Sequence, residues 1–218
     1  DILENGSKPA TVPTVEVQKH LMVFAAYTSP GYPQYYHSTS NGDGSFTTPV
    51  PIDYEMAYPY FTLVEDFNND GFPDIVVSKA DGQLVILLND GANNFSPPTL
   101  IENVTPYWYV NSSSLGSAGD FNEDGNKDIV LSNGPARIEA DGKAYYDIHL
   151  LLGNGDGTFN ITVIPYDITD LLSRNNVVRD YYLPPYFYAE AKAADFNNDG
   201  HLDLMLTPLS HQFYGWGQ

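Results

Sequence analysis

Cysteine is absent from the 218 residues of this chain. Disulfide bonds and thiolate metal sites are therefore excluded, and the fold must be stabilised by other means. Hydrophobic residues still make up 42% of the chain and aromatic residues 14%. This composition excludes a disordered polymer and is sufficient for the core of a single domain spanning residues 1–218.

Basic residues are also scarce. Nine Lys and Arg stand against 28 Asp and Glu, which gives a formal net charge of −19. Such a surface repels the phosphates of nucleic acids and of anionic lipids, so we expect no nucleic-acid partner. It attracts cations instead.

Long apolar segments are missing as well. No apolar run approaches the roughly 20 residues that a membrane-spanning helix requires, so we expect no membrane insertion. No charged and then apolar signal segment opens the chain. We therefore interpret Asp1 as the start of a mature or excised product.

Common catalytic signatures are not found. The sequence has no Gly-x-Ser-x-Gly elbow, no His-Glu-x-x-His pair and no P-loop, and its five histidines show no metal-ligand spacing. A glycosidase-type carboxylate pair stays open, because spatial pairs are invisible in a sequence. The candidates for it are Asp53, Glu55, Glu102 and Asp180.

The sequence does contain one acidic hexapeptide three times: DFNNDG at 66–71, DFNEDG at 120–125 and DFNNDG at 195–200. Counted from its first Asp, each copy has side-chain oxygens at positions 1, 3, 5 and 9, glycine at position 6 and a main-chain carbonyl to offer at position 7. Hard oxygen ligands at this spacing predict three Ca²⁺ sites. The residues concerned are Asp66, Asn68, Asp70, Phe72 and Asp74; Asp120, Asn122, Asp124, Asn126 and Asp128; and Asp195, Asn197, Asp199, His201 and Asp203.

The residues after each loop exclude an EF-hand. Position 12 holds Val77, Leu131 or Leu206 where an EF-hand needs a bidentate glutamate. The segment that leaves each loop is β-prone and apolar, so the loop joins two strands rather than two helices. The alternative is three ordinary hairpin turns, which explains the Asp-Gly pair but not four oxygens at fixed offsets.

The hexapeptide belongs to a longer unit. In the first two copies a second apolar run and a Gly/Asn-rich turn ending in Phe come next, at residues 83–95 and 148–159. A similar half-unit near the N-terminus has the apolar run 21–26, an inserted tyrosine-rich stretch and the turn 41–46. The expected fold is all-β: a β-propeller of four-stranded antiparallel blades, with a calcium loop between the first two strands of each blade.

The pattern Asp-Phe-Asn-x-Asp-Gly-x-x-Asp-Ile/Leu, with its downstream glycine-rich turn, resembles the FG-GAP/VCBS repeats of integrin α-subunit propellers, bacterial surface proteins and mushroom lectins. The resemblance covers most of residues 20–207. It implies that the nine Asp named above and the three Asn at position 3 bind calcium on one face of the propeller and that ligands bind the opposite face. It also implies an extracellular or cell-surface location.

We place the blade units at about 55–104, 105–165 and 186–207, the last completed by a hairpin from residues 20–52. Residues 165–185 are expected to be an insertion with one short helix near Thr169–Val178. Three blades are fewer than the roughly 4–8 of known propellers. A fourth blade without the motif, an excerpt of a larger propeller and association of copies all stay open. We favour the last two, because an open blade edge is an aggregation hazard.

A Pro-Tyr-aromatic triplet precedes each loop. Its rings either pack between blades as core or form a ligand platform with tyrosine hydroxyls as polar handles. The six residues are Tyr60, Phe61, Tyr107, Trp108, Tyr186 and Phe187.

The sequence thus favours a calcium-stabilised recognition or adhesion module that binds a glycan or a protein ligand. The alternatives are a structural module of a surface or matrix assembly, formed by homo-oligomerisation, and the scaffold of a polysaccharide-active enzyme.

Overall fold

The computed structural model describes residues 21–27, 33–52, 54, 62–79, 83–92, 94–102, 104, 116–132, 137–170 and 189–208. All of its sheets are antiparallel, which confirms the expected all-β class. Helical geometry occurs at residues 169–170, where the predicted helix begins, and the remainder of that helix lies outside the described residues. No helix within the ranges given above is long and apolar enough to cross a membrane.

The first complete unit is a four-stranded meander in the order β4-β5-β6-β7. Its strands are β4 (Thr62–Glu65), β5 (Asp74–Ser78), β6 (Leu84–Leu87) and β7 (Thr99–Ile101). All of β6 and most of β5 are buried, because neighbouring sheets cover both faces. This burial explains why their sequences read as continuous Ile, Val and Leu instead of an apolar–polar alternation.

The second unit has the same meander order, β8-β9-β11-β12, with one short additional strand, β10. Its strands are β8 (Gly116–Gly119), β9 (Asp128–Ser132), β10 (Arg137–Ile138), β11 (Ala144–Gly153) and β12 (Phe159–Asp167). β11 is long enough to pair with both β9 and β10 along one edge and with β12 along the other. β12 ends at Asp167. The first three residues of the expected insertion, 165–167, therefore belong to this strand.

The two chain ends form separate sheets. One contains β1 (Leu21–Tyr27), β2 (Pro33–Thr39) and β3 (Val50–Pro51), and the other contains β13 (Ala189–Ala194) and β14 (Asp203–Pro208). The tyrosine-rich stretch is therefore not an insertion but the strand β2, in register with β1. Tyrosine is enriched in β-strands, and the interpretation of this stretch as an insertion did not take that preference into account. Joining of the two end sheets into one blade is not seen among the described strands and stays a prediction.

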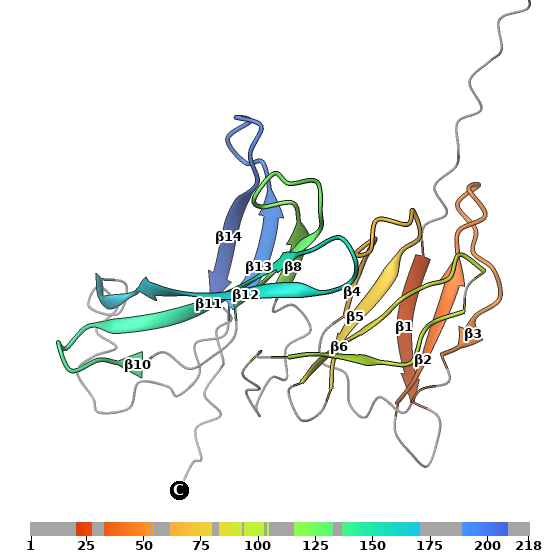
Figure 1. Cartoon of the computed structure of the whole chain (residues 1–218), viewed down its shortest axis with the longest axis horizontal. Coiled ribbons are helices and arrows are strands. Elements are labelled where there is room, and N and C mark those ends of the chain that lie inside the picture. Colours follow the sequence, from red (N-terminus) through yellow and green to blue (C-terminus); the bar gives the residue numbers. More distant parts are fainter. Residues whose placement is uncertain are drawn as a thin grey trace, which may run out of the picture.

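The four sheets contact one another through β1 and β4, β4 and β8, and β8 and β13. In Figure 1 the upright strands form a row, with β13–β14 to the left of β8 and β1–β3 to the right of β4, while β11 and β12 extend leftward below β13–β14. Within the part of the chain that the structure describes, this row is open rather than closed into a ring.

Side chains that alternate along β5 join the sheets into a continuous core. Ile75 and Val77 pack with Tyr35 of the N-terminal sheet, whereas Val76 packs with Ile129 of the second unit. A third cluster joins the second unit to Leu204 and Leu206 of β14. These contacts hold the sheets side by side, and the three acidic loops all emerge along the same edge of the row, the upper edge in Figure 1.

Candidate metal centres

The first acidic loop connects β4 and β5 and curls around its own carboxylates. The amide N–H of Asp70 donates to Asp66 Oδ1 and to Asn68 Oδ1, each at 3.1 Å, and the N–H of Gly71 donates to Asp66 Oδ2 at 2.9 Å. The N–H of Phe72 donates to Asp70 Oδ1 at 2.9 Å. The side chains at positions 1, 3 and 5 therefore turn toward the same concave stretch of backbone.

Two backbone positions make this curl possible. Glycine at position 6 has φ of +87°, +89° and +92° at Gly71, Gly125 and Gly200. Residues with a side chain rarely adopt such angles, which accounts for the glycine in all three copies. Position 4 is also left-handed in every copy, at Asn69, Glu123 and Asn198, with φ of +58°, +61° and +61°. The sequence interpretation did not foresee this second left-handed residue.

The other two loops repeat the geometry. The N–H of Asp124 donates to Asp120 Oδ1 at 3.1 Å, and the N–H of Gly125 donates to Asp120 Oδ2 at 2.9 Å. The corresponding distances to Asp195 in the third loop are 3.1 and 2.9 Å. The threefold repeat in the sequence is thus a threefold repeat in space.

Position 9 has a structural role that sequence reasoning missed. Asp74 is fully buried, and its Oδ2 accepts the N–H of Phe67 (3.0 Å) while its Oδ1 accepts the N–H of Asn89 (2.8 Å). The carboxylate thus joins the loop to Asn89, two residues after the third strand of the unit, β6. Burial raises the pKa of Asp74 to about 6, although both hydrogen bonds act in the opposite direction.

The second unit repeats this connection and the third does not. Asp128 is also fully buried and accepts the N–H groups of Phe121 (2.8 Å) and Gly153 (2.9 Å). Asp203 accepts the N–H groups of Phe196 (2.9 Å) and Asn197 (3.3 Å), both on Oδ2. No third strand comes after β14 among the described residues, so Oδ1 of Asp203 has no partner of that kind there.

The donor set of each loop suits a hard cation. Positions 1 and 5 offer carboxylates and position 3 an amide oxygen, and none of the nine loop aspartates pairs with Lys or Arg in the described part of the chain. Within the same residues no three Asp, Glu or His side chains converge as a ready-made cage. Position 3 is Asn in every loop, and the position-9 carboxylates Asp74 and Asp128 each accept two backbone N–H groups. The oxygen chemistry fits calcium, with ligation shared between carboxylates, an amide and main chain.

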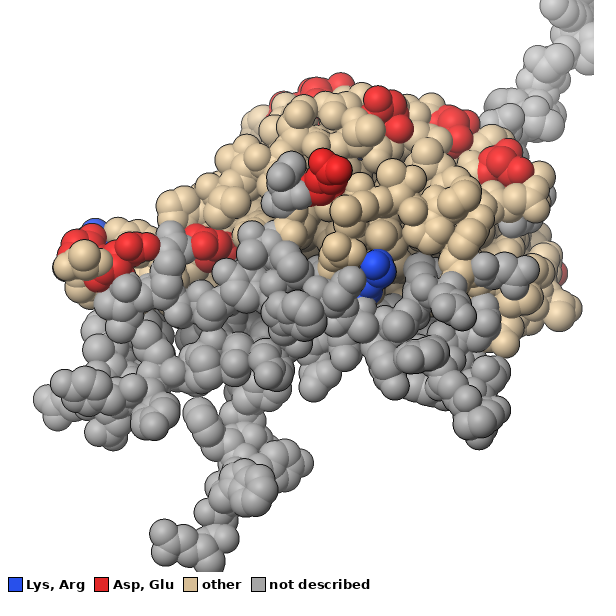
Figure 2. All heavy atoms as spheres, turned by 60° about the horizontal axis from the view of Figure 1, so that its bottom comes forward, with Lys and Arg blue, Asp and Glu red and all other residues tan. Residues whose placement is uncertain are grey.

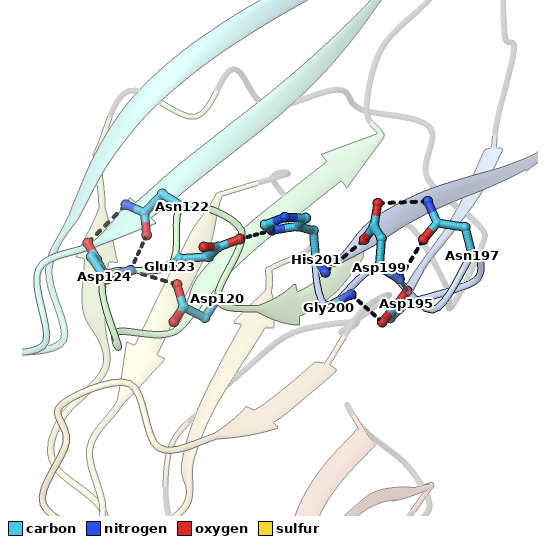
Figure 3. A network of polar contacts seen from close by, with 9 residues as sticks. All are labelled: Asp120, Asn122, Glu123, Asp124, Asp195, Asn197, Asp199, Gly200 and His201. Atoms are coloured by element: carbon cyan, nitrogen blue, oxygen red, sulfur yellow. Dashed lines mark hydrogen bonds and ion pairs between the residues drawn. The ribbon is translucent and has the colours of Figure 1, made fainter.

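Neighbouring loops touch through positions 4 and 7. Asn69 Nδ2 of the first loop donates to Asn126 Oδ1 of the second at 2.7 Å. Glu123 of the second loop forms an ion pair with Nδ1 of His201 in the third, which raises the pKa of that histidine (Figure 3). The position-7 side chains of the second and third loops therefore make contacts between loops, in addition to the main-chain carbonyl that the sequence analysis assigned to this position.

The surface around the loops is acidic. In Figure 2, Asp and Glu side chains recur along the upper rim of the described surface, and few Lys or Arg side chains are visible. This pattern agrees with the net charge of −19.

The six aromatic residues predicted as a ligand platform, and Asp53, Glu55 and Asp180 of the possible carboxylate pair, lie outside the described residues. Sequence reasoning missed a cleft of about 330 Å³ between the N-terminal sheet and the turn after β6. Phe95 and His37 meet edge to face there, and the Tyr54 hydroxyl donates to the carbonyl of Phe95 at 3.2 Å. No short sequence motif marks this cleft, because its walls come from two different sheets.

Comparison with known proteins finds a family resemblance over part of the chain. The family model of the FG-GAP-like repeat matches residues 66–131, which confirms the resemblance over the first loop, the rest of the first unit after β4, and the second loop. No curated protein matches the sequence. Among solved structures, the chain is similar to an Agrocybe aegerita lectin described as specifically recognising non-reducing terminal N-acetylglucosamine. The identity is 16% and the TM-score 0.36, over 87% of this chain and 60% of the lectin chain. The chain thus spans less than two thirds of that lectin.

Proposed function

We propose that this protein is a calcium-stabilised recognition module that binds a glycan or a protein ligand outside the cell. The observation that carries the proposal is the repetition of one loop geometry three times along one edge of the row of sheets. Hairpin turns alone do not need three carboxylates per loop, and like charges so close together destabilise the fold unless a cation is bound. The FG-GAP-like match at residues 66–131 favours recognition over catalysis.

In the first loop, Asp66, Asn68 and Asp70 would hold the ion with the main-chain carbonyl of Phe72 and with Asp74. Bound calcium supplies positive charge that offsets the repulsion among these carboxylates. Asp74 contributes in a further way, because its hydrogen bonds to Phe67 and Asn89 hold the loop against the sheet. The equivalent residues of the other two loops act in the same way.

The ligand would bind the aromatic residues that precede the loops. Flat rings next to tyrosine hydroxyls suit the apolar face and the hydroxyls of a sugar, and they also suit a protein surface. The double substitution Tyr107→Ala and Trp108→Ala should abolish binding on a glycan array probed in calcium, while the circular dichroism spectrum stays unchanged. The matched control is Tyr166→Ala, because Tyr166 is an exposed ring on β12, outside these triplets. Loss of the folded spectrum in the double variant would instead identify the rings as core.

A second candidate function, a module of a larger assembly, is supported by the phenylalanine at position 2 of each loop. Phe67 is buried because the next unit covers it: its ring meets Phe159 edge to face, and its carbonyl accepts the N–H of Gly157 at 3.1 Å. Its counterpart Phe196, in the last loop, is 56% exposed. Phe46, which holds the place of Phe159 in the N-terminal turn, is 44% exposed. The Phe46 ring of a second copy of the chain can therefore pack against the exposed Phe196 ring of the first.

Light scattering in calcium should then give a mass of at least two chains, and Phe196→Ser should reduce it to one, because the substitution removes the apolar contact. Val163→Ser is the control, since Val163 is 48% exposed on β12 and outside this contact. A monomeric wild-type protein would contradict the assembly function and leave the recognition function standing.

A further inference from the structure

The contacts between loops obey one rule. The side chain at position 4 of a loop binds the side chain at position 7 of the next loop along the chain, first as Asn69 with Asn126 and then as Glu123 with His201. We call these the inter-loop pairs. The residues of the first pair are 57 positions apart, and those of the second are 78 apart. The same two loop positions are used although the chemistry differs, an amide pair in one case and an ion pair in the other.

The loop backbone directs position 4 outward. The polar side chains at positions 1, 3 and 5 hydrogen-bond within their own loop, as Asp120, Asn122 and Asp124 do in Figure 3. Glu123 lies among them in the left-handed conformation and reaches instead toward His201. Asn is among the residues that adopt this conformation most readily, which suits Asn69 and Asn198.

A glycine in the second unit, Gly155, leaves space for the side chains of the first inter-loop pair. A Cβ atom built on Gly155 would lie 2.4 Å from Asn126 Oδ1 and 2.7 Å from Asn69 Nδ2. Gly155, in the turn between β11 and β12, therefore packs directly against the amide pair. Any larger residue there would displace one of the two amides.

We propose that the inter-loop pairs couple calcium binding in neighbouring loops, an inference that rests on the proposed calcium function. Position 7 offers its main-chain carbonyl to its own loop, and its side chain is held by position 4 of the preceding loop. Ordering of one loop therefore orders the carbonyl ligand of the next. Calcium binding is then positively cooperative between the first and second loops and between the second and third loops.

The chain contains its own matched control. Asn198 is at position 4 of the last loop, with φ of +61° against +58° for Asn69, but it has no position-7 partner among the described residues. Alanine at either site meets the same backbone strain, and only Asn69→Ala breaks an inter-loop pair. Gly155 and Gly142 give a second comparison, because both have positive φ, +75° and +80°, yet a Cβ on Gly142 would meet nothing within 4 Å.

The test is a calcium titration by isothermal calorimetry on the calcium-free full chain. Asn69→Ala should weaken the apparent affinity about two- to tenfold, the equivalent of one net hydrogen bond, and lower the Hill coefficient. Asn198→Ala should bind like the wild type. Gly155→Ala should resemble Asn69→Ala, whereas Gly142→Ala should bind normally, and melting in EGTA checks that each variant is folded.

Two outcomes overturn the inference in distinguishable ways. Equal calcium affinity and equal Hill coefficients in Asn69→Ala and Asn198→Ala, with wild-type binding in Gly155→Ala, would show that the loops bind independently, and the proposed function would stand. Absence of any calcium binding by the wild-type chain would overturn both.

Discussion

Chelation of calcium with EGTA should lower the melting temperature of this protein by about 10 °C relative to about 1 mM calcium. A site with a Kd of about 10⁻⁴ M, typical of extracellular modules, adds about 1.4 kcal/mol at that concentration. Three such sites add about 4 kcal/mol before any coupling between them is counted. For a chain of this size, 1 kcal/mol changes the melting temperature by roughly 2–4 °C. Differential scanning calorimetry with and without EGTA measures the shift.

Single-loop variants make this measurement specific. Asp70→Asn removes a carboxylate that belongs to the first loop alone, so it should reduce the calcium-dependent shift by about a third, the share of one site in three. Asp156→Asn is the control, because Asp156 is an exposed aspartate in the turn between β11 and β12 that accepts hydrogen bonds from Thr158 instead. If EGTA leaves the melting temperature of the wild-type chain unchanged, the acidic hexapeptides are turns and the calcium proposal is wrong.

Asp128→Ala should lower the free energy of unfolding by about 2–3 kcal/mol, even in EGTA. The substitution removes the acceptor of two backbone N–H groups, from Phe121 and Gly153, at a fully buried site. Each unpaired buried donor costs about 1–3 kcal/mol, and release of the desolvated carboxylate offsets part of the sum. Urea unfolding followed by tyrosine and tryptophan fluorescence measures the change.

Asp203→Ala is the matched control for this effect. Asp203 has the same loop position, but it is only half-buried and uses one carboxylate oxygen for both of its backbone hydrogen bonds. Its removal in EGTA should cost about 1 kcal/mol, because water can replace the lost acceptor. Equal losses in the two variants would show that the connection to the third strand contributes nothing to stability.

The loops were predictable because their interactions are local. The hydrogen bonds that curl the first loop join residues at most five positions apart, and glycine at position 6 marks the left-handed turn. The fold class was predictable for a related reason, since β-prone runs and glycine-rich turns alternate along the chain. The tyrosine-rich strand β2 was missed because its residues were interpreted as an insertion between the apolar run 21–26 and the turn 41–46.

The sequence by itself determined the all-β class, the three acidic loops and their oxygen donors, because nine consecutive residues contain all of the information for each loop. Only the tertiary structure decided which distant groups meet them. Asn89 reaches Asp74 from across the sheet, and Asn69 reaches Asn126 from another unit. The same holds for the open row of four sheets, which depends on strand pairing and on packing between faces. Such contacts depend on how sheets stack, and a repeat in the sequence does not encode them.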